Sequence, residues 1–394
     1  MLQRRSKVAL QAFNLTKLQR QAAPPPTHPL PGLYKQPPLV ALSSSLTHSF
    51  PLPNRLAVTS AFFRPQAHPH HMAGASAQPA WAQALAAVGL LIASRAATCL
   101  ALWLYAAFLR PAKPLRRRYG AWAVVTGATD GIGRALAFEL ASAGLGLVLV
   151  GRSPDKLAAV ASEIRTRSSS SSRPAEVRTF VIDFDDADGL AASVDALGES
   201  IRGLDVGVLV NNAGRCYPYA RYFHEVSEEL TRSLIRINVE AVTRVTHAVL
   251  QGMVERKRGA VVNIGSGAAT ILPSDPLYAV YAATKAYVDQ FSRSLYVEYK
   301  NKGIDVQCQA PMYVATKMAS IRKPSLFAPS PEDYARAAVR YIGYEPRCTP
   351  YWAHSLVWFL FSVLPESVAD RYVLNMSLGI RHKGMAKDAR KKAQ

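Results

Sequence analysis

Two residues four positions apart, Tyr281 and Lys285, lie in "VYAATKAYVDQF" (280–291), where apolar residues recur at helical spacing. On a helix, positions i and i+4 share a face, so the phenol and the ammonium can meet. Tyrosine has a pKa of about 10, too high for ready proton exchange at neutral pH, and a nearby ammonium favours the phenolate. The pair is either an ordinary solvated pair or a tuned acid. The choice depends on what else the chain binds.

A glycine cluster, "TGATDGIGRAL", follows the first apolar, strand-like run. Gly127, Gly131 and Gly133 have the spacing GxxxGxG, and a helix is expected to open at Ile132. Glycines here let the backbone turn tightly and approach a pyrophosphate, which then lies at the helix N-terminus among free N–H groups. Because the cluster stands between a buried strand and an amphipathic helix, it indicates a dinucleotide-binding turn.

The second strand-like run ends in "LVGRSPDKL". An acidic residue at this place would accept the 2′-hydroxyl of NAD. Arg152 stands there instead, with Lys156 one turn later, and a guanidinium suits a 2′-phosphate. The sequence therefore predicts NADPH as the cofactor. The alternative is that Arg152 is only a solvated loop charge.

The motifs occur in a set that resembles the short-chain dehydrogenase/reductase family. "TGATDGIG", "NNAG" (211–214), "IN" with Asn238, "NIGSG" with Ser266 and "YAATK" follow one another in that family's order. Longer segments, among them "PSDPLYAVYAATKAYVDQFSRSLYVEY", are similar to the plant microsomal very-long-chain 3-oxoacyl-CoA reductases, whose animal kin include 17β-hydroxysteroid dehydrogenase type twelve. The family resemblance covers residues 121 to about 318, and the closer one covers residues 72–394.

The resemblance implies roles for the matching residues. Tyr281 would protonate the developing alkoxide, Lys285 would tune it and hold the nicotinamide ribose, and Ser266 would hydrogen-bond the substrate carbonyl. Asn238 would hold a water that links Lys285 to solvent. The other implied cofactor contacts lie in the glycine turn and after the third, fourth and sixth strands: Gly127, Thr129, Asp130, Gly131, Ile132 and Gly133; Asp183; Asn212, Ala213 and Gly214; Val314 and Thr316.

Some of these matches leave alternatives open. Asp183 can equally cap a turn, and Asn211 is expected to pin the central sheet rather than touch substrate. Ser266 can simply close a strand end, and its interval to Tyr281 exceeds the family's usual one, so the intervening loop must bulge. Met312 stands where most relatives have glycine.

Positioning these residues requires alternating strands and helices. From residue 121 onward, amphipathic helical stretches alternate with six β-branched runs, at 122–126, 147–151, 177–183, 206–211, 260–265 and 304–309. Their near-continuous apolarity indicates burial on both faces of a sheet. The sequence therefore predicts an α/β fold, a doubly wound parallel sheet of Rossmann type, over residues 121–380.

The chain before this domain differs in composition. Residues 1–71 are rich in proline, serine and histidine, and no acidic residue precedes Asp130, so 14 of the 20 net positive charges fall within the first 129 residues. This segment is either an organelle transit peptide or an extension that the working protein lacks; the second is favoured, with Met72 as the start. Charge placed away from the catalytic domain argues against nucleic acid as a partner.

Residues 81–109 form an almost continuous apolar run, long enough to cross a bilayer. Its one charge, Arg95, must snorkel, pair, or mark a helix that dips rather than crosses. The basic residues of 110–118 place that flank in the cytosol by the positive-inside rule. We therefore expect a membrane anchor with a cytosolic catalytic domain.

Two further features bear on location. The basic tail, 381–394, carries Lys391 and Lys392 at the fourth and third positions from the end, the dilysine pattern of endoplasmic reticulum membrane proteins; the alternative is a solvated tail. The four cysteines form no CxxC and no cluster with histidine, which predicts a reducing compartment and neither disulfide nor structural metal.

The resemblance implies reduction of very-long-chain 3-oxoacyl-CoA to 3-hydroxyacyl-CoA in fatty acid elongation, toward wax and sphingolipid precursors. The implied partners are the endoplasmic reticulum membrane and the condensing enzyme, dehydratase and enoyl reductase of an elongase complex. A second apolar stretch, 352–365, is too short to span; it is either a core helix closing the pocket, which is favoured, or a segment that dips into the membrane and admits an acyl chain. The alternative functions are a steroid or other lipid-ketone reductase and a non-catalytic nucleotide-binding scaffold.

Overall fold

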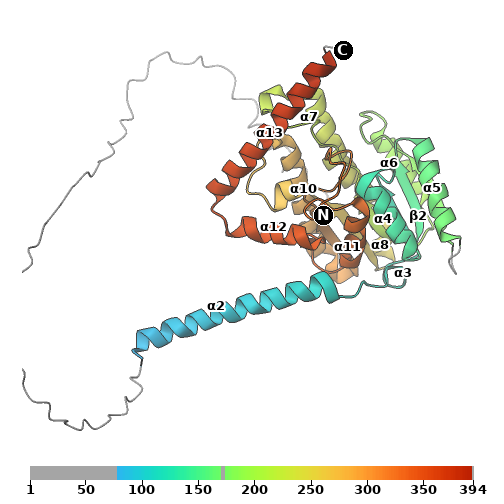
Figure 1. Cartoon of the computed structure of the whole chain (residues 1–394). Coiled ribbons are helices and arrows are strands. Elements are labelled where there is room, and N and C mark those ends of the chain that lie inside the picture. The colour runs from blue at the N-terminus through green and yellow to red at the C-terminus, as the bar shows by residue number, and fades with distance from the viewer. Residues whose placement is uncertain (1–77, 170–173, 393–394) are drawn as a thin grey trace, which may run out of the picture. The chain divides into compact units, whose positions relative to one another are not determined.

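A seven-stranded parallel sheet forms the centre of the structure, a computed structural model that describes residues 78–169 and 174–392 (Figure 1). In chain order the strands are β1 (Trp122–Thr126), β2 (Gly146–Gly151), β3 (Val177–Val181), β4 (Val206–Asn211), β5 (Gly259–Ile264), β6 (Ile304–Gln309) and β7 (Arg347–Cys348). Their order across the sheet is β3-β2-β1-β4-β5-β6-β7, which reverses direction between β1 and β4. This is the arrangement of a doubly wound fold, so the predicted fold class is confirmed. The expectations about residues 1–71 and Met72 lie outside the described residues.

The six predicted runs correspond to β1–β6 with small shifts at their ends. β2 and β5 each begin one residue earlier than expected, β5 ends one residue earlier, and β3 ends at Val181 rather than at residue 183. β7 is not predicted, because two residues paired with the end of β6 leave no periodic pattern in the sequence.

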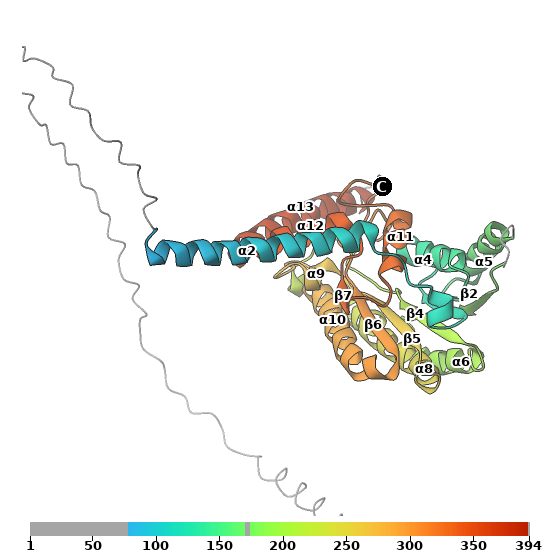
Figure 2. The same ribbon diagram turned by 90° about the horizontal axis from the view of Figure 1, so that it is seen from below.

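Helices cover both faces of the sheet, as Figure 2 shows. One layer contains α4 (Gly131–Ser142), α5 (Pro154–Ser168) and α11 (Pro331–Tyr341); the other contains α6 (Leu190–Ser200), α8 (Ala241–Glu255) and α10 (Ala279–Tyr299). Side chains alternate between the layers along each strand: Val125 and Leu149 pack in the first, and Val124 and Val150 in the second. Burial on both faces explains why the central strands read as continuous apolar runs, whereas the edge strand β3 is mostly exposed.

The remaining elements of the domain are short. They are α3 (Leu115–Arg118), η2 (Phe223–Glu225), α7 (Glu228–Ile235), η3 (Arg236–Glu240), α9 (Gly267–Thr270) and η4 (Lys300–Lys302). η3 is one turn of π-helix between α7 and α8, and it carries Asn238. Such π-helical turns are rare and often occur at functional sites.

The long apolar helix α2 (Ala80–Leu104) continues into a π-helical turn, η1 (Tyr105–Leu109). Together they span 30 residues with no buried residue, long and apolar enough to cross a membrane. Arg95 is exposed on α2, and within the described residues it forms no ion pair or side-chain hydrogen bond.

Two helices end the described chain, α12 (Trp352–Val363) and α13 (Glu366–Lys392). Only Ala353 and His354 of α12 are buried, whereas Phe359 is 60% exposed and Val363 is 61% exposed. The favoured prediction of a core helix is therefore wrong for most of α12, because only its first turn is buried and one side of the helix, with Phe359 and Val363, is uncovered. The segment expected as a basic tail continues α13 as far as Lys392.

Candidate active site

The predicted glycine turn lies at the carboxyl end of β1, at the point where the strand order reverses. Gly127 and Gly131 have φ of +64° and +53°, in the region that favours glycine. Asp130 caps α4 by accepting a hydrogen bond from the Gly131 N–H at 2.8 Å. A β-carbon at Gly133 would lie 2.2 Å from Nδ2 of Asn212, so only glycine fits there.

The residues after β4 close this turn from the other side. Nδ2 of Asn212 donates to the carbonyl oxygens of Thr126 and Gly127, at 3.1 and 3.2 Å. The backbone N–H groups of Asn212 and Ala213 both donate to the Thr126 hydroxyl, at 3.0 and 3.1 Å. The ends of β1 and β4 are thereby held together, and the predicted "NNAG" segment lies beside the glycine turn.

The segment after β6 reaches the same place. A β-carbon at Gly131 would lie 3.2 Å from Cγ2 of Thr316, and Lys317 pairs with Asp130 at 2.8 Å. Burial raises the pKa of Asp130, but the hydrogen bonds from Lys317 and the Gly131 N–H outweigh it and hold that pKa below its usual range. Val314 is buried nearby in the chain. The structure thus brings Gly131 and Thr316 together.

Arg152 follows β2 and, like Lys156, is exposed. In the described part of the chain neither cation forms an ion pair. A β-carbon at Gly151 would lie 3.3 Å from Cγ2 of Thr129, which places Thr129 of the glycine turn next to the end of β2. A tight turn, a helix N-terminus and two unpaired cations fit a phosphate-bearing dinucleotide.

Asp183 lies just beyond β3, and its carboxylate accepts a hydrogen bond from the Asp185 N–H at 3.0 Å. This is the turn-capping role that was the alternative for this residue. The side chain is exposed. Asn211 pins the sheet, as expected: Nδ2 donates to Thr246 and to Asn263 at 2.8 Å each.

Lys285 is buried on α10, and its Nζ donates to the carbonyl of Ile264 at 2.9 Å. Burial lowers the pKa of Lys285 to about 8, so the ammonium form dominates at neutral pH but is lost in mild base. Within the described residues no hydrogen bond joins Lys285 to Tyr281. The alternative of a solvated i,i+4 pair is excluded, because the Lys285 side chain is buried and points to the end of β5.

Tyr281 stands one helical turn before Lys285, and its hydroxyl faces Ser266. Burial raises the pKa of Tyr281 well above 10, and only the Ser266 hydroxyl acts to lower it. The expected lowering by Lys285 is therefore not found in the protein alone, because desolvation of the phenolate dominates.

Ser266 begins the bulged loop that the long Ser-to-Tyr interval requires. Its hydroxyl accepts from the Ala268 N–H at 3.2 Å and caps α9, the extra turn of helix in this loop. A β-carbon at Gly267 would lie 2.2 Å from Sδ of Met312, so the side chain that replaces the usual glycine fills space against this turn.

Asn238 is fully buried, and both hydrogens of its side-chain amide are already donated within the protein. Oδ1 accepts from the Arg215 N–H at 2.8 Å, while Nδ2 donates to the Arg215 carbonyl at 2.9 Å and to the Thr284 hydroxyl at 3.0 Å. Asn238 thus joins the segment after β4 to α10 beside Lys285. Its amide hydrogens are not available for the water that the family resemblance implies.

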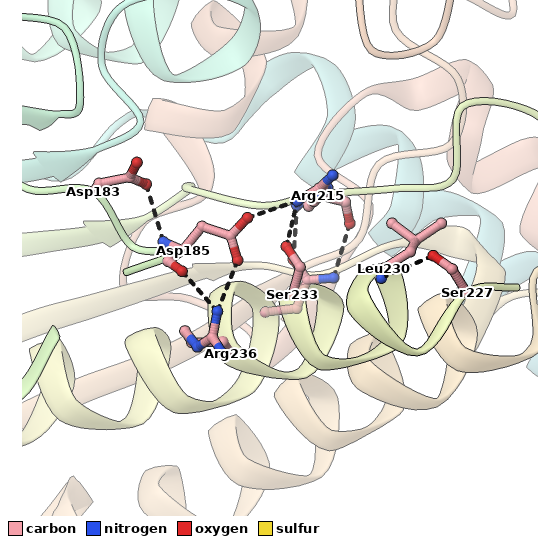
Figure 3. Close-up of polar contacts among 8 residues, drawn as sticks. Asp183, Asp185, Arg215, Ser227, Leu230, Ser233 and Arg236 are labelled. Atoms are coloured by element: carbon pink, nitrogen blue, oxygen red, sulfur yellow. Dashed lines mark hydrogen bonds and ion pairs between the residues drawn. The ribbon is translucent and has the colours of Figure 1, made fainter. Parts of the chain in front are cut away.

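One charged cluster beside the site is not predicted. Figure 3 shows Asp185 between Arg215 and Arg236, bonded to them at 2.6 and 3.1 Å, with Arg215 also donating to Ser233. The cluster fixes the segments after β3 and β4 to α7 and η3. Arg215 directly follows "NNAG", and this position could have marked it as a residue near the site. Its partners, Asp185 and Ser233, can be identified only from the folded structure.

A second group missed from sequence surrounds the Tyr281 hydroxyl. Asp275, Tyr313 and Cys216 are close enough to shift the pKa of Tyr281 upward. Burial raises the pKa of Asp275 itself to about 7. Asp275 is the only acidic residue between Ser266 and Tyr281, which could have marked it.

The fold and these residues define an enzyme class, and comparison with known proteins agrees. The short chain dehydrogenase family matches residues 121–325. The chain belongs to this family.

Among curated relatives, a very-long-chain 3-oxoacyl-CoA reductase-like protein of Arabidopsis thaliana is 49% identical over 288 residues, 72% of this chain and 89% of the relative. The very-long-chain 3-oxoacyl-CoA reductase of Homo sapiens is 43% identical, over 66% of this chain and 81% of the relative. An inactive hydroxysteroid dehydrogenase-like protein of Homo sapiens is 42% identical, over 67% and 79%. The protein is therefore closely related to very-long-chain 3-oxoacyl-CoA reductases, within a group that also contains an inactive member.

Solved structures agree on the fold. A 7β-hydroxysteroid dehydrogenase superposes with a TM-score of 0.58 at 26% identity, covering 66% of this chain and 98% of that one. A gluconate 5-dehydrogenase from Beutenbergia cavernae, with bound NADP, superposes with a TM-score of 0.51 at 28% identity, covering 60% and 98%. One structural neighbour of this chain thus holds NADP, at low occupancy.

Proposed function

We propose that this protein is an NADPH-dependent reductase that converts very-long-chain 3-oxoacyl-CoA to 3-hydroxyacyl-CoA in fatty acid elongation. The observation that carries the proposal is the placement of Tyr281 beside Ser266, and of buried Lys285 beside Gly214, in the segment that closes the glycine turn. The relatedness to very-long-chain 3-oxoacyl-CoA reductases supports the choice of substrate.

NADPH, when bound, supplies the hydride for the substrate's C3 carbonyl carbon. The Ser266 hydroxyl donates a hydrogen bond to the carbonyl oxygen and orients it toward Tyr281. The Tyr281 hydroxyl then gives its proton to that oxygen as negative charge develops there. The charge that remains on Tyr281 is stabilised by the Lys285 ammonium on the next turn, which opposes the effect of burial. Solvent afterwards reprotonates the phenolate.

The cofactor would be held by the elements that meet at the sheet's reversal point. N–H groups of the glycine turn, Gly127 to Gly133, would bind its pyrophosphate, and Arg152 with Lys156 would pair with the 2′-phosphate. Asp183 would lie at the adenine end, beside the turn it caps. The remaining contacts proposed for the ribose and nicotinamide are Asn212, Ala213, Gly214, Val314, Thr316 and Lys285.

The long helix α2 would anchor the enzyme in the endoplasmic reticulum membrane. Its length and full exposure support this, and the basic residues of 110–118 favour a cytosolic domain. The Lys391 and Lys392 pair would act as a retrieval signal on that side. An elongase complex would supply the substrate from a condensing enzyme and pass the product to a dehydratase.

The inactive relative makes a non-catalytic scaffold the second candidate. The intact Tyr281, Lys285 and Ser266 set argues against it, because a scaffold needs no buried lysine at that position. The deciding experiment measures NADPH oxidation by the purified full chain in phospholipid vesicles, with very-long-chain 3-oxoacyl-CoA and with oxosteroids. Faster oxidation with the acyl-CoA supports the proposal; oxidation only with steroids, or with neither, contradicts it.

A further inference from the structure

The face of α12 that points away from the domain is apolar and uncovered. Its exposed apolar side chains, with those directly after it, include Phe359 at 60%, Leu360 at 50%, Val363 at 61%, Leu364 at 42% and, on α13, Val368 at 51%. No charged residue occurs between Trp352 and Pro365. A contiguous exposed apolar face of this kind marks a contact with lipid or another protein.

The start of α12 is tied to the end of the long helix α2. The rings of Phe108 and Trp352 lie 6.2 Å apart, centroid to centroid. Arg110, two residues after Phe108, pairs with Glu345. Its guanidinium lies over the rings of Tyr341 and Tyr344, 4.6 and 4.0 Å from their centroids. The Phe108 contact places the start of α12 at the end of η1, and the Arg110 contacts fasten that end to the domain.

The residues at this junction are those typical of a membrane surface. Tryptophan, tyrosine and arginine side chains gather at the boundary between hydrocarbon and water. Beyond the junction, α12 has 12 residues. It is therefore about 18 Å long, too short to cross a hydrocarbon core of about 30 Å. The chain then returns to polar sequence, since Glu366 and Asp370 begin α13. Both views place α12 and α13 on the side of the sheet away from α5 and α6 (Figures 1 and 2).

The buried first turn of α12 leads directly to the active site. The Met312 N–H donates to Nδ1 of His354 at 3.3 Å, and Met312 is the residue that fills the space beside Gly267. Tyr313, the next residue, is among the groups around the Tyr281 hydroxyl. Met312 and Tyr313 therefore lie between the first turn of α12 and the active site.

We propose that α12 lies in the hydrocarbon of the cytosolic leaflet, with the charged start of α13 at the polar surface of that leaflet, as a second membrane contact that does not span. The occupant of this face is lipid, because the face begins where the emerging end of the α2–η1 helix meets α12, at the contact of Phe108 with Trp352. The inference rests on the proposed anchoring of α2. An acyl chain dissolved in that leaflet reaches the site along α12 without crossing water.

The test uses the full chain with single fluorescent labels, reconstituted in phosphatidylcholine–phosphatidylserine vesicles. Native Cys99 on α2 is exposed and reports the anchor. In a Cys99→Ala background, Val363→Cys reports α12, and Val297→Cys, at a 75% exposed valine on α10, is the matched control. Labelling of Cys99→Ala alone corrects for reaction at Cys216. Each label is quenched in turn by acyl-chain nitroxide lipid and by aqueous iodide.

We expect nitroxide quenching at position 363 to be several-fold greater than at position 297, and iodide quenching to be several-fold smaller. Equal behaviour at 363 and 297 would overturn the proposal. Shielding at 363 from both quenchers would also overturn it, because a second copy or another protein would then cover the face. If the label on Cys99 is not quenched by the nitroxide lipid, the proposed anchoring of α2 is wrong. This result is independent of the activity assay, so it is distinguished from a failure of the proposed reaction.

Discussion

The ammonium of Lys285 on α10 donates to the carbonyl of Ile264, the last residue of β5, at 2.9 Å. Ser266 follows two residues later, so one hydrogen bond sets the positions of the lysine and the serine relative to each other. Asn238 adds a second tie through Thr284, the neighbour of Lys285. Lys285 is thus positioned by the end of a central strand and Asn238 by α10, which suits a reaction that needs fixed geometry.

Replacing Tyr281 by phenylalanine should remove the proton donor while keeping the ring. We expect kcat for ketone reduction to fall by about a hundredfold to ten-thousandfold, with the NADPH dissociation constant unchanged. Tyr287→Phe, an exposed tyrosine on the same helix, is the control. Stopped assays and cofactor fluorescence give the two quantities. Near-normal turnover in Tyr281→Phe would refute the mechanism.

The pH dependence of the rate should report Lys285. Its pKa is lowered to about 8, so its charge is present below that pH and is lost above it. The rate of reduction should therefore decline as pH rises through about 8, because neutral lysine no longer stabilises the phenolate. Lys285→Arg keeps a charge that does not titrate in this range, so the decline should move to higher pH. An unchanged pH–rate profile in Lys285→Arg would contradict this assignment.

Cofactor choice should depend on Arg152. Arg152→Asp replaces a charge-assisted hydrogen bond by repulsion, which should raise KM for NADPH by about ten- to a hundredfold and affect NADH little. Arg293→Asp makes the same charge change on an exposed part of α10 and should leave both values unchanged. Equal KM values for the two cofactors in the unmodified enzyme would show that Arg152 does not select NADPH.

Asp275 should make the protein less stable as pH rises. Its pKa is about 7 in the folded state, against an ordinary value of 3.8, so between these values the native state binds more protons than the unfolded state. The free energy of unfolding therefore decreases from pH 4 toward neutrality by this contribution. In Asp275→Asn the decrease should be smaller, as seen in unfolding midpoints at acid and neutral pH. Asp195→Asn, at an exposed site on α6, is the control, and an identical pH dependence in Asp275→Asn and the unmodified protein would refute the prediction.

The proposed topology should be visible to a protease. In sealed microsomes, added protease should digest the domain from Ala121 onward, because the basic flank of α2 holds it in the cytosol. A lumenal protein in the same vesicles should survive until detergent is added. Protection of the catalytic domain before detergent would reverse the orientation.

The fold could be predicted from the sequence because its central strands, β1, β2, β4, β5 and β6, are buried on both faces and therefore stand out as apolar runs. The edge strand β3 is mostly exposed and stands out only by its β-branched residues, and β7, with two residues, does not stand out. The glycine turn could be placed for a similar reason, since Gly127 and Gly131 adopt positive φ that other residues resist.

Other features of the site depend on distances that no local pattern contains. The i,i+4 spacing of Tyr281 and Lys285 indicates a shared face but not that the lysine points to Ile264. Asp185 has two arginines as partners, from different elements, and the sequence gives no hint of the pairing. The apolar run of α12 fits a core helix and a membrane contact equally well. Only the exposure of Phe359 and its neighbours separates these interpretations.

The contacts of α13 have a consequence for how large substrates enter and products leave. Near its start, Asp370 accepts a hydrogen bond from Ser274, in the loop that carries Asp275. Farther along, Arg381 pairs with Glu225 and Asp388 accepts from Tyr219 at 2.8 Å, both in the segment that follows "NNAG". Two loops near Tyr281 are thus both bonded to α13. Neither loop can move away from α13 without breaking one of these contacts, so a displacement of α13 would carry both loops with it.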